Sequence, residues 1–369
     1  MIYLDNGATS FPKLPQVRQA MEMAVSRCAN PGRGGHEASL LAARTVYRCR
    51  ERASALFGCR PEQVVFTSNC THGLNIAIRS LVKPGSRVLV SGFEHNSVMR
   101  PLYALDAKIT VAGRKLFDPA DTLSRFEDAL RRGVDAAVFT HASNVFGYVL
   151  PVEELCALCR RYGVPFAVDA AQSAGTEEIK LDTWGADFIA MPGHKGLLGP
   201  MGTGLLLCGK TPEPLLYGGT GTESIRREMP EDLPERLEAG TVNVPGIAGL
   251  DAGLKYLQRN GMEKIRRREG REARRCAEGL EKLGLRVFSG DHQNGTVSFL
   301  APGDGEELAA ALGRRGVAVR AGLHCAPLAH ESAGTLDTGT VRISFGIHAC
   351  PAETGRFLEI LRAVLGKYK

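Results

Sequence analysis

The sequence lacks any apolar run that approaches the length of a membrane-spanning helix. Such a helix needs about 18 or more consecutive apolar residues, and no stretch of the chain provides them. The opening residues, Met1 to Asp5, lead at once into a strand-like segment, and a secretion signal is not evident. We therefore expect a protein that neither crosses a membrane nor associates with one.

Cysteine is present, but not in the pattern of a disulfide-stapled protein. The chain has 10 cysteines in 369 residues, and we expect most of them to be buried, reduced thiols in a cytoplasmic protein. One Cys-x-x-Cys pair, Cys156 and Cys159, lies within a helix-like run and has no second pair of ligands nearby. We predict no metal site and assign this pair to helix packing.

Motifs for nucleic-acid recognition are also lacking. The net charge of +6 is spread along the chain, and its densest basic run is a group of arginines between residues 266 and 275. Glutamates at positions 263, 269 and 272 interleave with these arginines at helical spacing, and no aromatic stacking residues accompany them. This pattern is typical of a solvated helix face, and we predict no nucleic-acid partner.

Short apolar runs alternate with longer periodic segments over the first two thirds of the chain. The runs predicted to be buried strands are Val64–Ser68, Arg87–Ser91, Ile109–Ala112, Ala136–Thr140, Phe166–Asp169, Phe188–Met191 and Gly204–Cys208. Segments such as 71–81, 121–132 and 152–162 lie between them and have the helical period. The alternation predicts an α/β fold with a mainly parallel sheet covered on both faces, and ligands then bind beyond the carboxyl ends of the strands.

The pattern of helical and strand-like segments changes after Asn243. A helical stretch runs from about residue 247 to residue 283, and strand-like runs follow at 296–300, 317–320 and 340–345. A chain of 369 residues suits two domains. We predict a large domain at residues 14–246 and a smaller C-terminal α+β domain at residues 247–369, with segment 1–13 joined to the smaller one.

Three segments carry residues suited to binding a phosphorylated, electron-withdrawing cofactor. Lys195 follows a strand in a glycine-rich turn, where its side chain is free to project into a pocket. Asp169 ends an apolar strand, and its carboxylate suits a cationic pyridine nitrogen, although the same residue type is also a common helix N-cap. Residues 65–73 form a strand, a small-residue turn and a helix start, which offers backbone N–H groups to a phosphate without being a Walker or GxGxxG motif.

Eight short motifs together give the chain a family resemblance. They are Tyr3 to Thr9, Thr67 to Thr71, Glu94 to Ser97, Ser143 to Gly147, Val168 to Gln172, Gly193 to Lys195, Glu238 to Asn243 and Arg320 to Ala326. In this order they resemble the class V aminotransferase-fold enzymes and, among those, the cysteine desulfurase and selenocysteine lyase family. The resemblance implies a pyridoxal-phosphate (PLP)-dependent transferase of fold type I with a large and a small domain.

The resemblance also implies which residues bind the cofactor. Lys195 is implied to hold PLP covalently and to move protons at the substrate Cα. Asp169 is implied to hold the pyridine nitrogen and Gln172 the phenolic oxygen. His95 is implied to stack on the ring and also to serve in proton transfer. The residues implied to bind the phosphate are Cys70 (through its backbone), Thr71 and His194.

Further residues are implied to bind the substrate or to connect two subunits. Arg342 matches the family's clamp for the substrate carboxylate, and Asn144 is implied to assist it and to lie near the ring. Arg33 resembles a second, entrance motif, and for each arginine a plain surface charge is the alternative. A threonine that matches Thr241 reaches the phosphate of the neighbouring subunit in the family, which implies a homodimer with shared active sites.

Cys325 is the residue that distinguishes between the reactions open to a PLP enzyme. It lies in the segment Val319 to Pro327, which resembles the short nucleophile loop of type II, SufS-like desulfurases. His324 and Arg320 are close in sequence and would favour its thiolate. The implied reaction converts L-cysteine to L-alanine, with the sulfur left as a persulfide on Cys325 and then passed to a sulfur-acceptor protein or a reductant. Either Lys195 or His95 is the base.

Three alternatives remain open from the sequence. A selenocysteine lyase acting on L-selenocysteine would use the same residues. Another class V lyase or aminotransferase would use the PLP site without Cys325. A non-catalytic sulfur-carrier scaffold would keep the fold alone, and the joint presence of Lys195, Asp169, His95 and Cys325 argues against it.

Overall fold

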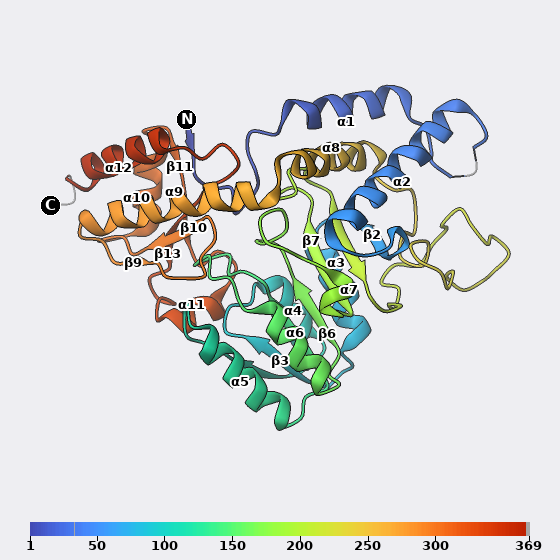
Figure 1. Ribbon diagram of the computed structural model, residues 1–369, viewed down its shortest axis with the longest axis horizontal. Helices are drawn as coiled ribbons and strands as arrows, with labels where there is room; N and C mark the ends of the chain where they lie inside the picture. The colour runs from blue at the N-terminus through green and yellow to red at the C-terminus, as the bar shows by residue number, and fades with distance from the viewer. Residues whose placement is uncertain (33, 367–369) are drawn as a thin grey trace.

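A seven-stranded sheet forms the centre of the protein. The computed structural model describes residues 1–32 and 34–366 (Figure 1). The strands are β2 (Val64–Thr67), β3 (Arg87–Ser91), β4 (Lys108–Ala112), β5 (Ala136–Thr140), β6 (Phe166–Asp169), β7 (Phe188–Pro192) and β8 (Gly204–Cys208). Their order is β2-β8-β7-β6-β5-β3-β4, and only β8 runs antiparallel to its neighbours. The predicted α/β fold with a mainly parallel sheet is confirmed.

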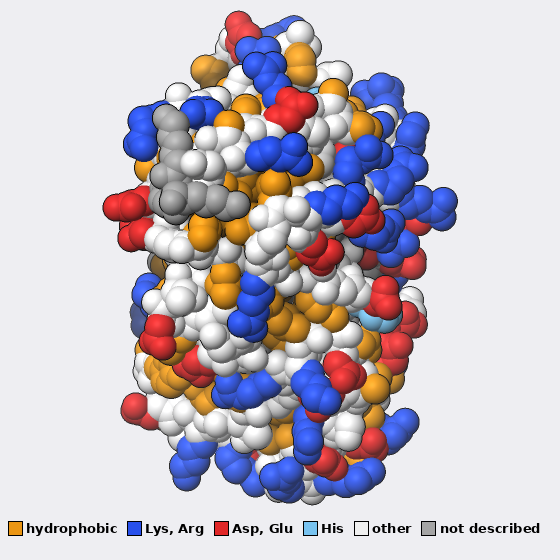
Figure 2. Space-filling model, turned by 90° about the vertical axis from the view of Figure 1, so that its left-hand side faces the viewer, with side chains coloured by type: hydrophobic (Ala, Val, Ile, Leu, Met, Phe, Trp, Pro, Cys, Tyr) orange, Lys and Arg blue, Asp and Glu red, His pale blue; other side chains and the backbone are white. Residues whose placement is uncertain are grey.

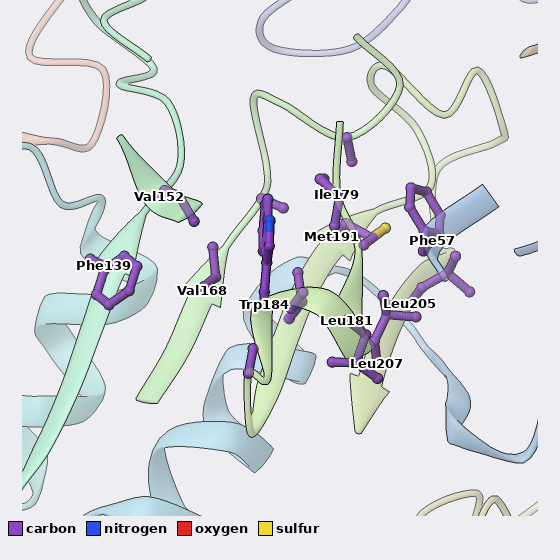
Figure 3. Close-up of a cluster of buried hydrophobic side chains, with 14 of the residues drawn as sticks. Phe57, Phe139, Val152, Val168, Ile179, Leu181, Trp184, Met191, Leu205 and Leu207 are labelled. Carbon is purple, nitrogen blue, oxygen red and sulfur yellow. The ribbon is translucent and has the colours of Figure 1, made fainter. Parts of the chain in front are cut away.

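Helices cover both faces of this sheet because the strands are apolar on both sides. The helices of this part are α1 (Pro15–Arg27), α2 (Glu37–Phe57), the 3-10 turn η1 (Pro61–Gln63), α3 (Cys70–Leu81), α4 (Asn96–Ala104), α5 (Pro119–Arg131), α6 (Val152–Arg161), α7 (Leu181–Trp184) and α8 (Val244–Asn260). Phe139, Val168 and Leu207 belong to the core on one face, which Figure 3 shows together with Trp184 of α7. The alternate residues of the same strands belong to the core on the other face, where α3 and α4 pack. Two-sided burial explains why these strands read as unbroken apolar runs.

The helical stretch expected at residues 247–283 consists of two helices. Helix α8 ends at Asn260 and α9 (Met262–Lys282) begins two residues later. Gly261 between them has a φ of +78°, which lies outside the helical region and suits glycine. Helix α8 packs against α1 and α2 at the top of Figure 1, whereas α9 runs on toward the C-terminal part.

The C-terminal part contains two small sheets and its own core. Its elements are β9 (Val287–Phe288), β10 (Thr296–Phe299), α10 (Gly305–Gly313), β11 (Val317–Ala318), β12 (Arg320–Gly322), α11 (Pro327–Ala333), β13 (Thr340–Ser344) and α12 (Pro351–Leu365). An antiparallel sheet has the order β12-β13-β10-β9. Strand β1 (Ile2–Tyr3) pairs in parallel with β11, which ties the start of the chain to this part. The run expected as one strand at 317–320 is therefore divided between two sheets.

The predicted division of the chain at residue 246 stays a prediction. Ile247, Leu250 and Leu254 of α8 belong to the core beneath the large sheet, whereas Cys276 and Leu280 of α9 belong to the C-terminal core. From this packing we propose that the two parts meet at Gly261.

The surface of the C-terminal end mixes both signs of charge. On the face in Figure 2, Lys and Arg side chains alternate with Asp and Glu side chains over much of the surface. On α9, Glu263 pairs with Arg266 and with Arg267, which lie three and four residues along the helix. None of the helices within residues 1–32 and 34–366 combines the length and the apolar character that crossing a membrane requires.

Candidate active site

The carboxyl ends of the parallel strands gather most of the predicted site residues. Lys195 follows β7, Asp169 ends β6, Asn144 follows β5 and His95 follows β3. Thr71 is in the first turn of α3, directly beyond β2. Because these strand ends meet at one edge of the sheet, residues 124 positions apart in the chain lie around one site.

Asp169 is almost fully buried, and its Oδ1 atom receives two hydrogen bonds. The backbone N–H of Ala171 donates to Oδ1 at 2.9 Å, and the Sγ of Cys70 lies 3.4 Å from the same atom. Burial lowers the pKa of the nearby Lys195 amine, and Arg342 acts in the same direction, while Cys70 and Asp169 oppose them. A lowered pKa leaves more of the amine neutral, which is the form that acts as a nucleophile or a base.

His95 is held by the first turn of α4. Its Nδ1 accepts a hydrogen bond from the backbone N–H of Ser97 at 3.0 Å, so His95 caps the N-terminus of the helix. The Ser97 hydroxyl also lies 2.7 Å from the hydroxyl of Thr71, which joins the starts of α3 and α4. Burial lowers the pKa of His95, with an opposing effect from Asp169, so the imidazole is neutral near pH 7.

The turn between β2 and α3 has the form of an anion cradle. Asn69 accepts a hydrogen bond from His72 N–H at 2.9 Å and caps α3, a helix of 12 residues, while Thr71 is exposed. His194 contributes a neutral ring to the same edge of the sheet, because burial lowers its pKa to about 4 and Lys195 and Lys13 add to that effect. Helix N–H groups, a hydroxyl and a neutral imidazole are donors that suit a phosphate.

Lys13 and its neighbours fix the turn that carries His194 and Lys195. The carbonyl oxygen of His194 accepts hydrogen bonds from Lys13 Nζ at 2.7 Å, Thr9 Oγ1 at 3.0 Å and Ser10 Oγ at 3.1 Å. Lys13 belongs to none of the motifs that carry the family resemblance. Its contribution depends on contacts between residues about 180 positions apart, which no local pattern reveals.

Arg342 lies deep in the site with its charge balanced by Asp5. Its side chain is 3% exposed; Nη2 donates to Asp5 Oδ1 at 2.8 Å and Nη1 donates to the Asn144 carbonyl at 2.9 Å. Asp5 also accepts hydrogen bonds from Arg320, whose Nη2 lies 3.0 Å from Asp5 Oδ2. The opening motif contained Asp5, but its link to both arginines became evident only in the folded chain.

Cys325 lies on a loop that the rest of the site holds in place. Among the cysteines of the described residues it alone is exposed, and His324 and Cys325 have left-handed φ angles of +50° and +56°. The side chain of Asn144 donates to the His324 carbonyl at 2.7 Å, and the backbone N–H of Asn96 donates to the Cys325 carbonyl at 2.8 Å. The cysteine loop is therefore fastened beside His95, the residue that precedes Asn96.

Gln172 lies close to Lys195, but other predicted residues lie elsewhere. The Gln172 amide donates to the Gly7 carbonyl at 3.0 Å, and Gln172 and Lys195 line one small cavity of about 50 Å³. Thr241 is exposed on the segment before α8, where it lines a separate cleft of about 830 Å³ with Tyr47. Arg33 lies outside the described residues.

Comparison with known proteins shows the family to which the chain belongs. A family model described as aminotransferase class-V matches residues 2–357. A protein of Methanothermobacter thermautotrophicus described as a probable cysteine desulfurase is 33% identical, over 99% of this chain and 95% of that protein. A Haloferax volcanii protein described as a cysteine desulfurase is 30% identical, over 98% and 89% of the two chains.

A solved structure is similar over almost the whole chain. The apo structure of a cysteine desulfurase from Thermococcus onnurineus NA1 has 32% sequence identity and a TM-score of 0.91, and the match covers 99% of this chain and 95% of that one. Both the match over residues 2–357 and these full-length relatives point to one assignment. The chain belongs to the class V aminotransferase family, in the branch whose relatives are named cysteine desulfurases.

Proposed function

We propose that this protein is a PLP-dependent cysteine desulfurase, which converts L-cysteine to L-alanine and carries the sulfur as a persulfide on Cys325. The observation that carries the proposal is the position of Cys325. Its thiol is exposed, whereas most other cysteines of the chain are buried, and its loop is hydrogen-bonded to Asn96 beside His95. A cysteine with a purely structural role would have no reason to be exposed at that point.

PLP fits the groups that surround the site. Asp169 has both of its hydrogen bonds on Oδ1, which leaves Oδ2 for a pyridine nitrogen. His194 Nδ1 and Asn144 Oδ1 are buried polar atoms without a hydrogen-bond partner among the described residues, so the site has binding capacity that the protein itself does not use. Lys195 would hold the cofactor covalently.

We assign the remaining contacts to PLP from the places of the other site residues in the fold. His95 would cover one face of the ring and Gln172 would bond its phenolic oxygen. The residues that would bind the phosphate are Thr71, His194 and, through its backbone at the start of α3, Cys70. Bound PLP supplies an electron sink that labilises the substrate's Cα proton and then its Cβ–S bond.

The residues of the chain supply the other parts of the reaction. Arg342 binds the substrate carboxylate with a guanidinium that Asp5 and Asn144 orient. Lys195 or His95 accepts the proton from Cα, because burial lowers the pKa of each and so favours the neutral form that acts as a base.

Cys325 completes the reaction as the nucleophile. Its thiolate attacks the sulfur of L-cysteine, the Cβ–S bond breaks and an S–S bond forms. The carbon fragment gains protons and leaves as L-alanine, so that L-cysteine and a thiol give L-alanine and a persulfide with atoms and electrons balanced. We propose that an acceptor protein then takes the sulfur, and that the protein works in a reducing, cytoplasmic setting in which this thiol stays free.

We also propose that the enzyme is a homodimer with shared sites. Thr241 is exposed and lines a cleft whose lining does not include Lys195, which leaves its side chain free to contact a second subunit. Tyr217 and Ile225 on the preceding segment are 75% and 100% exposed, which suits a surface that a second subunit covers.

The decisive experiment measures alanine formation from L-cysteine with a thiol reductant. We expect the PLP-loaded parent and the Cys350→Ala control to form alanine, and Cys325→Ala to lose at least about 100-fold in rate, because its nucleophile is absent. Equal turnover by parent and Cys325→Ala would refute the assignment of Cys325. Faster turnover of L-selenocysteine than of L-cysteine would instead identify the protein as a selenocysteine lyase.

A further inference from the structure

Cys70 is a second cysteine of the site, and the reaction proposed above does not use its side chain. It is the first residue of α3 and is 7% exposed. Its Sγ lies 3.4 Å from Oδ1 of Asp169, which is 99 positions away in the chain and 2% exposed. This is within hydrogen-bonding distance for sulfur, which is a larger atom than oxygen.

The thiol contacts one oxygen of the carboxylate and leaves the other free. Oδ1 of Asp169 receives the contact from Cys70 and the hydrogen bond from the Ala171 N–H at 2.9 Å. Within the described residues, Oδ2 receives none. Two donors on one oxygen fix the rotation of a carboxylate, so the second oxygen points in a defined direction.

Cys70 has the proton that such a bond needs. Burial raises the pKa of its thiol well above the ordinary value, and Asp169 adds to this effect, while Lys195 opposes it. The side chain is therefore a neutral S–H group at physiological pH. A cationic donor here would cancel the charge of Asp169, whereas a neutral donor orients the carboxylate and leaves its charge available.

We propose that Cys70 is a positioning residue: its S–H group holds Oδ1 of Asp169 so that Oδ2 faces the ring nitrogen of bound PLP. The inference rests on the proposed cofactor, and it explains why a thiol in a sulfur-transferring enzyme is kept buried and protonated. The same burial prevents Cys70 from competing with the exposed Cys325 as a sulfur acceptor.

The test measures PLP binding to the full-length protein without substrate. Cys70→Ser keeps a neutral donor and Cys70→Ala removes it. We expect Cys70→Ala to raise the PLP dissociation constant about five-fold, which corresponds to the loss of one typical hydrogen bond, and Cys70→Ser to stay within about two-fold of the parent. Cys156→Ala is the matched control, because Cys156 is fully buried on α6, away from the site, and we expect it to bind PLP like the parent.

A purely structural role of Cys70 would give a different result. In that case Ser and Ala would weaken PLP binding equally, in proportion to their effect on the thermal stability of the cofactor-free protein, and the proposal would be overturned. Parent-like binding by Cys70→Ala would overturn it as well. A parent that binds PLP but forms no alanine would refute the proposed reaction alone, because cofactor binding is measured without it.

Discussion

Among single residues, Asp5 connects the two arginines of the site. Arg320 and Arg342 face each other as a directly opposite pair across β12 and β13, where like charges repel. Asp5 bridges them: Arg320 Nη2 donates to its Oδ2 at 3.0 Å, and Arg342 Nη2 donates to its Oδ1 at 2.8 Å. The two arginines and the aspartate together carry one net positive charge, which matches one substrate carboxylate.

We predict that Asp5→Ala both destabilises the protein and weakens substrate binding. Arg342 would remain buried with only the Asn144 carbonyl as a partner, and breaking a buried pair in this way costs about 3 kcal/mol. Removing the carboxylate also leaves Arg320 unpaired and so increases the positive charge near the substrate. We expect the lost orientation of Arg342 to have the larger effect, because Arg320 is half exposed and water screens its charge. We expect the KM for L-cysteine to rise about ten-fold, which is about 1.4 kcal/mol of binding free energy, as measured by steady-state kinetics.

Asp251 provides a matched control for Asp5. It also binds two arginines, Arg48 at 2.9 Å and Arg52 at 2.7 Å, with a side chain that is 7% exposed, but it belongs to α8 and its partners belong to α2. Asp251→Ala should lower the thermal stability without changing the KM. An unchanged KM in Asp5→Ala, at equal loss of stability, would show that Asp5 serves the fold alone.

At the scale of elements, the loop after β12 shows how the large part of the chain holds the nucleophile. His324 and Cys325 are consecutive left-handed residues, each of which costs about 1 kcal/mol for a side chain other than glycine. Asn144 and Asn96, which follow β5 and begin α4, each donate one hydrogen bond to this loop. The contacts offset the backbone strain and keep the thiol near the edge of the sheet.

Removal of the Asn144 side chain should release this loop. In Asn144→Ala the His324 carbonyl loses its donor, and we expect faster hydrogen–deuterium exchange of the Asn96 N–H, faster alkylation of Cys325, and a kcat reduced about ten-fold or more because the nucleophile is less well oriented. Exchange and alkylation are read by mass spectrometry of peptides. Asn75→Ala is the control, because Asn75 is half-buried on α3 and its side-chain amide donates to the Thr71 carbonyl rather than to the cysteine loop. Unchanged exchange in Asn144→Ala would mean that the loop holds its own conformation.

The sequence predicted the large sheet almost to the residue, because its strands are short, apolar and bounded by turns. Runs such as Ala136–Thr140 and Phe166–Asp169 have the expected bounds. The expected helix over 247–283 was wrong at one point, because Gly261 adopts a backbone conformation that helical periodicity does not reveal. Glycine within a helical pattern is tolerated often enough that its presence alone does not predict a break.

For the site, local motifs predicted which residues lie at the strand ends but not how they are held. Lys195 and Asp169 were singled out because one follows a strand and the other ends one, and His95 was identified from the family resemblance of its motif. The parts played by Asp5 and Asn96 depend on contacts over more than 200 positions in the chain, and no spacing rule encodes those. Whether Thr241 reaches a second subunit stays a prediction for the same reason.

At the scale of the whole molecule, helix α9 carries a buried glutamate, Glu269, where it contacts the large part of the chain. Glu269 of α9 is 9% exposed and lines the small cavity that Gln172 and Lys195 also line. Burial raises its pKa to about 8, Glu177 adds to the effect, and Arg268 opposes it. Arg268 does not pair closely with this carboxyl, because it donates to the Ile347 carbonyl at 2.8 Å. The carboxyl is therefore protonated at neutral pH in the folded protein.

This raised pKa predicts that the stability of the protein depends on pH in a specific direction. Between pH 4.5, the ordinary glutamate pKa, and about pH 8, the unfolded chain holds fewer protons on this group than the folded chain does. The free energy of unfolding therefore falls as pH rises through this range and levels off above it.

Glu269→Gln removes this dependence on pH. We expect the stability of the variant relative to the parent to rise by about 4 kcal/mol from about pH 5 to about pH 9, as measured by urea unfolding at these two pH values. Glu272→Gln is the control, since the Glu272 carboxylate accepts a hydrogen bond from Thr354 at 2.7 Å and lies 3.6 Å from Arg275, and its removal should not stabilise the protein at either pH. If Glu269→Gln and the parent differ by the same amount at both pH values, Glu269 ionises freely in the folded state and the contact between α9 and the large part of the chain admits water.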